Sequence, residues 1–429
     1  MTLAAGHEST DGGAAVLSAG PPSAPPGGGC PRGATAARTN GQEGQRLRAL
    51  GPAPVVDMPG AVQTRAVVDL ALAERPSAGP LVSRDAARHW PGYREGARSV
   101  DGVIAPWTGS HNALNSYGDD HWERRAPIAA ALTRRRVEAM TPVIESIVQD
   151  VLDGLDGVGA QRKVDLVQSY ALFIPHEVIT RLLGVPAEHL PAFSAAAAGL
   201  FDTSAGAEEM TRSMGAVLAF LDQLVSGARE HPGDNLVGDL VRAADASGNP
   251  LSDAALRDQL MLIIAGTEAT AHAIGTLLVH LLSHPDQLDL VTSGQVPMED
   301  ALTESLRLRP PIASVPLRFA ARQFEDARSG EQFGEGDPIH IAGADLHPER
   351  YEDPERFDVR REGGSRSLAF GYGPHVCPGA ALATREIVIA VTRFLERYPH
   401  ARLALAPEPL EQTASFISNC YTSIAVELS

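Results

Sequence analysis

The stretch Phe370-Gly371-Tyr372-Gly373-Pro374-His375-Val376-Cys377-Pro378-Gly379 places one thiol in a loop of small residues, directly before a segment with helical periodicity. Apolar residues recur at helical spacing from Ala380 to Tyr398, and Pro399 ends this segment. A helix N-terminus favours the thiolate form of a cysteine, and a thiolate can bind a metal or act as a nucleophile. The pattern therefore predicts a functional cysteine at the positive end of a core-facing helix.

Besides a role as a metal ligand, the residues alone leave three interpretations of Cys377 open. A lone cysteine is often a buried, inert residue, here in a glycine turn. A structural zinc site needs about four nitrogen or sulfur ligands, and only His375 is close in sequence. A catalytic Cys–His pair is chemically feasible, but no recognisable protease signature accompanies it.

The spacing Phe-x-x-Gly-x-x-x-Cys-x-Gly resembles the ligand loop of the cytochrome P450 family. The resemblance implies that Cys377 is the axial thiolate ligand of the iron in haem b, where sulfur donates electron density that favours O–O cleavage. Phe370, Gly371 and Gly379 are then residues that contact the cofactor. The implied fold is mainly α with a minor β region, in which haem lies between a central helix and the helix after the cysteine loop.

A second motif, Glu304-Ser305-Leu306-Arg307, lies on a predicted short helix that ends at Pro310. Glu304 and Arg307 are three residues apart and share one helix face. An isolated pair of this kind is usually a solvated surface pair. In the resembled family, however, this motif and a later arginine, here Arg356, form a buried ionic triad, and the planar guanidinium suits such bidentate binding.

A third motif, Ala265 to Thr270, lies within the apolar run from Leu260 to Leu282. This run exceeds the ~20 residues that span a bilayer, but Glu268, His272 and His280 interrupt it. We therefore predict a long helix buried in the protein. The resemblance places this segment over the haem.

Glu268 occupies the position of the acid that the family uses in oxygen activation, and Thr270 follows Ala269. Ala269 stands where the family normally has a threonine that assists proton transfer. Thr270 is turned by roughly 100° around the helix from that position, so a direct replacement is not expected. The predicted catalytic residues are therefore Glu268, Ala269 and Thr270. The alternative interpretation of Ala269 is a neutral substitution.

The resemblance predicts a monooxygenase that hydroxylates a small secondary metabolite with O2. Because Ala269 lacks a hydroxyl, proton delivery falls to water, Glu268 or the substrate. One alternative is oxidative C–C or C–N coupling or desaturation without oxygen insertion. A second alternative is a non-catalytic P450-like protein that only supports a partner enzyme, and the retention of Cys377 argues against it.

His121 and Arg125 are four residues apart on one helix face and resemble the family's His-x-x-x-Arg clamp for the haem propionates. Arg318 and His375 match two further propionate-contact positions, although His121 alone would be interpreted as a surface histidine. The expected lid, 191–230, is broken at Thr203-Ser204-Ala205-Gly206. The predicted substrate-pocket residues are Ala265, Ala269, Ile312, Val315, Phe416 and Ile417.

Composition limits the remaining classes of function. The chain has 429 residues and a net charge of -17, which argues against nucleic acid as a partner. Its three cysteines are too few for a disulfide framework and suit a reducing compartment. The Gly/Pro/Ala/Ser-rich residues 1–44 are predicted to be disordered, without a signal peptide or membrane anchor, and 45–429 to be one P450 domain. We therefore expect a cytoplasmic bacterial protein with no membrane partner.

The expected electron supply is NAD(P)H through a ferredoxin reductase and a ferredoxin. Two arginine clusters flank the predicted thiolate side of the haem, and we expect them to form a basic docking face for the acidic ferredoxin. A merely solvated surface is the alternative. The clusters are Arg124, Arg125, Arg134, Arg135 and Arg136, and then Arg360, Arg361 and Arg366.

Overall fold

The computed structural model describes residues 40–58, 62–94, 111–156, 163–186, 189, 193, 207–246, 251–313, 315–342, 351–361, 367–404, 410–412 and 418–428. Several predictions fall outside these ranges: most of the N-terminal tail, the predicted hinge at 203–206, Arg366, Phe416 and Ile417. The backbone of Val315 is described but its side chain is not.

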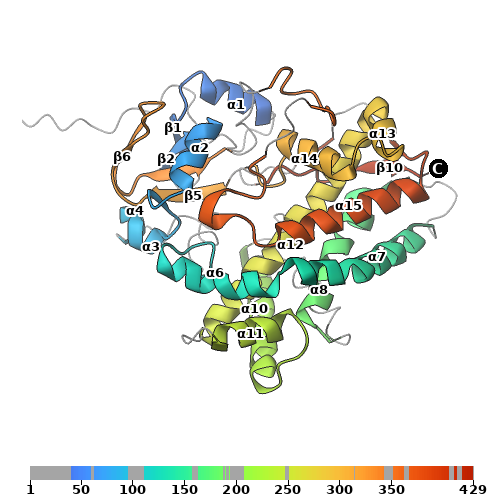
Figure 1. The fold of residues 1–429 in the computed structure, drawn as a ribbon, viewed down its shortest axis with the longest axis horizontal. Coiled ribbons are helices and arrows are strands. Elements are labelled where there is room, and N and C mark those ends of the chain that lie inside the picture. Colours follow the sequence, from blue (N-terminus) through green and yellow to red (C-terminus); the bar gives the residue numbers. More distant parts are fainter. Residues whose placement is uncertain are drawn as a thin grey trace, which may run out of the picture.

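Most of the described chain is helical, and one helix passes through the middle of the molecule (Figure 1). This is α12, Asp253–Ser283, which confirms the predicted long core helix. Leu260, Ile264 and Leu277 on it are fully buried or nearly so. An apolar window of α12 is long enough to cross a membrane, but 56% of it is buried inside the protein, as in a core helix. The helices packed against α12 include α8 (Phe173–Leu183), α10 (Ala207–Glu230), α14 (Met298–Leu308) and α15 (Ala380–Arg397).

The other helices surround this core. They are α1 (Asn40–Arg48), α2 (Leu70–Ser77), α3 (Ala86–His89), α4 (Pro91–Arg94), α6 (Asp119–Ala131), α7 (Arg134–Asp156), α11 (Leu236–Ala246) and α13 (Pro285–Thr292). The apolar stripe of α7 packs along α15 and α8, because Ile144, Ile147 and Val148 face the core. The sequence also predicts a helix over 135–155, and this helix and the one predicted over 380–398 are confirmed as α7 and α15.

A five-stranded sheet lies beside the helical part, in the order β1-β2-β8-β5-β3 (Figure 1). Its strands are β1 (Val55–Met58), β2 (Val62–Val67), β3 (Val82–Ser83), β5 (Val315–Ala320) and β8 (Pro338–Ile341). Only the β2–β8 pair is parallel. The register of β5 against β8 shifts between Val315 and Arg318, and Leu317 has a φ of 44°. Such a bulge re-aims the following side chain, here that of Arg318.

Two smaller sheets complete the minor β part. One has the order β4-β10-β9, from β4 (Lys163–Asp165), β10 (Ala425–Glu427) and β9 (Arg402–Leu403). The other pairs β6 (Phe324–Glu325) with β7 (Gln332–Phe333). The expectation of a mainly α fold with a minor β region is confirmed.

The sequence also predicts a single helix over Val164–Gly184, and this prediction is only partly right. Its start is strand β4, and a π-helical turn, Val167–Ala171, precedes α8. β4 pairs with β10, which lies about 260 residues later in the chain. Long-range pairing of this kind overrides local helical periodicity. At the other end of the domain, α1 begins at Asn40, before the predicted boundary at residue 45.

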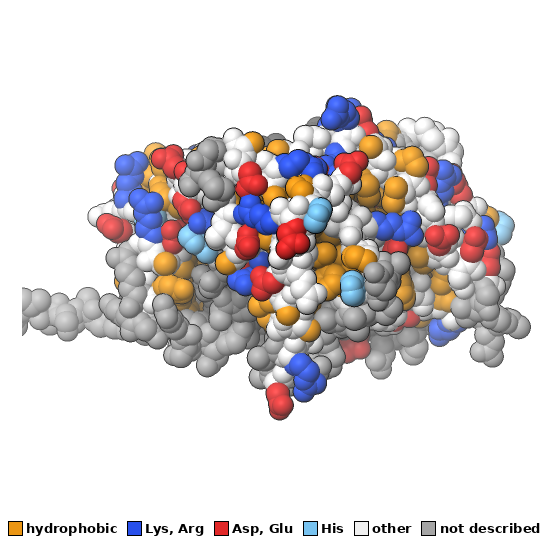
Figure 2. All heavy atoms as spheres, turned by 90° about the horizontal axis from the view of Figure 1, so that it is seen from below, with side chains coloured by type: hydrophobic (Ala, Val, Ile, Leu, Met, Phe, Trp, Pro, Cys, Tyr) orange, Lys and Arg blue, Asp and Glu red, His pale blue; other side chains and the backbone are white. Residues whose placement is uncertain are grey.

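The charged residues are interspersed by sign on the face that Figure 2 shows, where arginine, aspartate and glutamate side chains lie next to one another. Many are paired, as Arg229 is with Asp245 and Asp253. Exposed pairs of this kind stabilise a fold by only about 0–1 kcal/mol each. They indicate a solvated surface and not a charged binding site.

Candidate active site

The predicted cysteine loop is held in shape by its own backbone. The Cys377 N–H donates to the Phe370 carbonyl at 2.7 Å, and the Gly371 N–H donates to the Leu368 carbonyl at 2.8 Å. Burial raises the pKa of the Cys377 thiol, while N–H groups of Gly379 and Ala380 and the nearby charge of Arg125 act in the opposite direction. Because α15 begins at Ala380, the sulfur faces the N-terminus of that helix, as predicted.

Two glycines of the loop are required by its geometry. Gly371 and Gly373 have φ of 77° and 70°, a region that residues with a Cβ rarely adopt. A Cβ on Gly373 would also clash with the Ser77 carbonyl at the end of α2. Gly379 has an ordinary φ of -88°, and a Cβ there would lie 3.9 Å from the sulfur. Its lack of a side chain thus keeps the surroundings of the sulfur open.

Buried basic side chains gather beside this loop. Arg318 is 6% exposed and Arg84 is 2% exposed, and their guanidinium groups lie close enough to repel each other. Burial lowers the pKa of both, that of Arg318 to about 10. Nη1 and Nη2 of Arg84 and Nη1 of Arg318 have no hydrogen-bond partner within the described part of the chain. Buried guanidinium groups normally require an anion.

His121, His375 and Arg125 belong to the same cluster. His121 Nδ1 lies 2.8 Å from the Ala113 carbonyl oxygen, and Nε2 lies 3.0 Å from that of Pro374, so this histidine joins α6 to the cysteine loop. Its ring is 4.1 Å from that of His375. Burial and then the charges of Arg84, His121, Arg318 and Arg125 lower the pKa of His375 to about 2. The four predicted propionate contacts are thus brought together, and His121 is not a surface residue.

The middle of α12 carries the predicted catalytic residues. Ala265 and Gly266 are exposed although they lie in the centre of a core helix, and Ala269 is half-buried. The Thr270 hydroxyl donates to the Gly266 carbonyl at 3.3 Å and the side chain is 7% exposed. Thr270 is therefore bonded within its own helix, which agrees with the expectation that it does not replace the missing threonine hydroxyl.

The buried ionic triad exists, but one member differs from the prediction. Arg307 binds Glu304 with two hydrogen bonds, of 2.7 and 2.9 Å, and both side chains are almost completely buried. The second guanidinium on Glu304 belongs to Arg361, at 3.0 Å. Arg356 is exposed and contributes only its carbonyl oxygen, which accepts from Arg307. The assignment of the Arg356 side chain to the triad is therefore wrong.

The predicted substrate pocket is described only in part. Ile312 pairs with Ser418 through an isolated β-bridge, which brings the C-terminal segment next to the residues that precede β5. Val315 begins β5 in the same region. Ala265 and Ala269 lie on α12 as stated above, while Phe416 and Ile417 fall outside the described residues.

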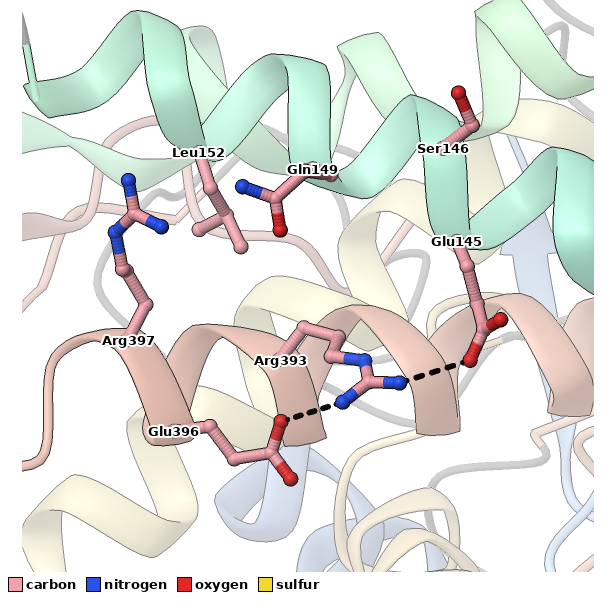
Figure 3. A pocket seen from close by; sticks show the side chains of 7 residues that line it. All are labelled: Glu145, Ser146, Gln149, Leu152, Arg393, Glu396 and Arg397. Carbon is pink, nitrogen blue, oxygen red and sulfur yellow. Dashed lines mark hydrogen bonds and ion pairs between the residues drawn. The ribbon is translucent and has the colours of Figure 1, made fainter.

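The groove between α7 and α15 in Figure 3 is not a second active site. Arg393 donates to Glu145 and to Glu396 at 2.9 and 2.8 Å (Figure 3). Arg397 pairs with Asp153 and Asp156. These interactions satisfy both arginines. The groove therefore ties the two helices together and holds no uncompensated charge for a ligand.

Comparison with known proteins decides the family. The cytochrome P450 family model matches residues 297–418. The 2-hydroxy-5-methyl-1-naphthoate 7-hydroxylase of Streptomyces carzinostaticus is 32% identical over 390 residues, which cover 90% of this chain and 94% of that protein. The chain belongs to the cytochrome P450 family. It is accordingly a haem-dependent oxidoreductase of the monooxygenase type.

Solved structures of cytochrome P450 proteins support the same family assignment. CYP154A1 from Streptomyces coelicolor A3(2) superposes with a TM-score of 0.83 at 35% identity, covering 92% of this chain and 98% of that one. CxnD, described as the cytochrome P450 for C–S bond formation in chuangxinmycin biosynthesis, gives a TM-score of 0.78 at 26% identity, covering 90% and 93%.

The residues present fit the haem of this family. A thiol surrounded by backbone N–H groups suits the iron, and the buried guanidinium nitrogens of Arg84 and Arg318 that have no partner within the described residues suit two propionate carboxylates. Three residues of the site were not predicted: Arg84, Arg361 as a triad member, and His272 beside Glu268. His272 could have been found from its i,i+4 spacing to Glu268, whereas Arg84 belongs to no recognisable motif.

Proposed function

We propose that this P450 hydroxylates a small, largely apolar secondary metabolite, with Cys377 as the haem ligand. The observation that carries the proposal is the cluster of buried cationic side chains around the cysteine loop, two of which have guanidinium nitrogens without partners among the residues that the structure describes. Bound haem supplies the oxidising chemistry. The similarity to a naphthoate hydroxylase supports a polycyclic or polyketide-like substrate.

In this proposal, each side chain has a separate task. Arg84, Arg125, Arg318, His121 and His375 hold the propionates, while Phe370 and Gly379 leave room for the ring near the sulfur. Glu268 holds and releases protons beside the substrate, because Ala269 has no hydroxyl and the Thr270 hydroxyl is bonded to the Gly266 carbonyl. Ala265, Ala269, Ile312 and Val315, with Phe416 and Ile417, line the substrate side.

The absorption spectrum tests whether haem is bound through Cys377, and the product tests which reaction takes place. The reduced carbonyl adduct of the purified protein should show the long-wavelength Soret band of thiolate ligation, and C377H should lose it without loss of the fold. Substrate should then shift the iron spin state, and the product should carry one additional oxygen atom. A protein that binds no haem after expression with ample haem precursor would contradict the proposal.

Electron transfer is proposed to use NAD(P)H, a reductase and a ferredoxin in the cytoplasm. A groove on the thiolate side is the candidate docking site, because Phe370 of the cysteine loop lines it together with two arginines and two glutamates, Arg134, Arg385, Glu138 and Glu299. The side chain of Arg134 is 91% exposed, and within the described residues it pairs with Glu138 of the same helix. Two arginines of the predicted docking face are not accessible to a partner protein, because the side chain of Arg124 is only 11% exposed and that of Arg361 is buried in the triad.

Oxidative coupling is a second candidate reaction. Ala269 removes the hydroxyl that assists proton transfer, and a similar structure is that of a P450 for C–S bond formation. Product mass separates the two reactions. A gain of one oxygen indicates hydroxylation, whereas a loss of two hydrogens indicates coupling or desaturation.

A further inference from the structure

Glu268 and His272 form a half-buried pair on α12. Nε2 of His272 lies 3.2 Å from Oε1 of Glu268, and the two side chains are 10% and 27% exposed. Residues four apart on a helix lie on the same face. His272 therefore lies on the same face of α12 as Glu268, the acid of the proposed reaction.

The second neighbour of His272 comes from the C-terminal segment. The side chain of Cys420 lies close enough to the imidazole to raise its pKa. Cys420 is 2% exposed, accepts a hydrogen bond of 2.7 Å from the Ser418 hydroxyl, and donates its thiol to the Pro311 carbonyl at 3.7 Å. The ring of His272 thus lies beside both the carboxylate of Glu268 and a buried sulfur atom.

The pKa of His272 agrees with a cationic ring beside Glu268. Burial lowers the pKa of His272, but the hydrogen bonds and charges of Cys420 and Glu268 outweigh burial and raise it to about 9. His176, on α8, also interacts with the charge of Glu268, yet burial lowers its own pKa. His272 is therefore the cationic partner of Glu268 near neutral pH, and His176 is neutral.

The two oxygens of Glu268 differ. Oε1 is bonded to His272, whereas Oε2 is buried and has no hydrogen-bond partner within the described residues. A carboxylate with one oxygen bound by a neighbouring side chain keeps one defined orientation. The remaining oxygen can then accept a proton and release it.

We propose that His272 is a positioning residue for Glu268: it binds Oε1 and orients the carboxylate, and leaves Oε2 to exchange protons. The proposal deepens the proposed function, since it rests on the role of Glu268 in proton delivery. It assigns a task to His272, which no motif identified.

The first test observes the ring directly and needs no turnover. Histidine labelled with 15N is titrated by NMR in the ferrous carbonyl holoenzyme, which is diamagnetic, and H272Q assigns the signal. We expect His272 to titrate near pH 9, and E268Q and C420A each to lower its pKa by about one unit, a tenfold change in proton affinity. Titration at or below the ordinary value of about 6.5, unchanged in E268Q, would overturn the proposal.

The second test compares H272L and H272Q with H280Q as the matched control. His280 lies two turns later on α12, is bonded to the Ser305 hydroxyl at 2.9 Å, and has a pKa lowered to about 3 by burial. H272L should reduce the product formed per NAD(P)H about tenfold, H272Q should restore part of it, and H280Q should change nothing.

The outcomes separate this proposal from the proposed function. If E268Q loses coupling while folded H272L keeps the wild-type coupling, the positioning role is refuted and the role of Glu268 stands. If E268Q itself keeps full coupling, proton delivery by Glu268 is refuted, and the role of His272 with it.

Discussion

The guanidinium of Arg361, and not that of Arg356, lies against the buried carboxylate of Glu304, with Nε 3.0 Å from Oε1. Arg361 also donates to the Glu352 carbonyl at 2.9 Å. One carboxylate thus joins α14 to the loop that leads into the cysteine segment, through Arg307 on its own helix and Arg361 on the loop.

This arrangement predicts unequal effects of two neighbouring arginines. R361A removes one partner of a buried charge, which costs on the order of 3 kcal/mol of unfolding free energy. R356A removes an exposed side chain and should change stability by no more than about 0.5 kcal/mol. Chemical denaturation of the holoenzyme, followed by helical circular dichroism, measures both. An R356A variant as unstable as R361A would contradict the structure.

Arg84 and Arg318 should matter for haem retention more than for the fold. A hydrogen bond to a charged group contributes about 1.5–3 kcal/mol, so R84L and R318L should each release haem about tenfold faster or more. Transfer of haem to apomyoglobin measures the rate. The exposed Arg322, just after β5, provides the control R322L. Equal rates for R84L, R318L and R322L would show that the buried guanidinium groups do not bind the propionates.

The sequence predicted those parts of the site whose residues lie close together in the chain. The cysteine loop, the Glu304–Arg307 pair and the Glu268 position follow from residues close together in sequence, and α7 and α15 follow from strong periodicity. Long-range geometry was not predictable. The strand β4 exists because β10 pairs with it, and Asp353, whose carbonyl accepts from the Arg356 N–H in a turn, has a φ of 46°.

Glu386, on α15, predicts a pH dependence of stability. It is 4% exposed, and burial raises its pKa to about 8, whereas an unfolded chain releases this proton near the ordinary value of about 4.3. Because the folded state holds the proton more tightly, this contribution to stability is complete below about pH 4.3 and is lost as the pH rises to 8.

The variant E386Q removes this titration and keeps the shape. Its unfolding free energy relative to wild type should rise between pH 5.5 and 8, with a limiting slope of about 1.4 kcal/mol per pH unit. E396Q, on the exposed side of the same helix, is the control. Parallel curves for wild type and E386Q would show that Glu386 is ionised in the folded protein.

Glu268 and Thr270 should differ sharply in their effect on turnover. General acid–base groups contribute about 10²–10⁴-fold to rate, so E268Q should lower product formation per NAD(P)H by about 100-fold. T270V should stay within a few-fold of wild type, because its hydroxyl is bonded to the Gly266 carbonyl within the helix. Product and peroxide are measured together. A collapse of T270V equal to that of E268Q would mean that Thr270 turns toward the substrate during catalysis.

The groove lined by Arg134, Phe370 and Arg385 should be the place where charge controls reduction. Electrostatic steering mainly affects association and weakens with salt, so R134E should slow reduction by an acidic ferredoxin several-fold at low ionic strength and flatten its salt dependence. R212E is the control, since Arg212 is also exposed but lies on α10. Stopped-flow reduction under carbon monoxide measures the rate. Because R134E changes only the encounter, substrate binding and the carbonyl spectrum should remain as in wild type, and a change in either would place Arg134 in the haem site instead.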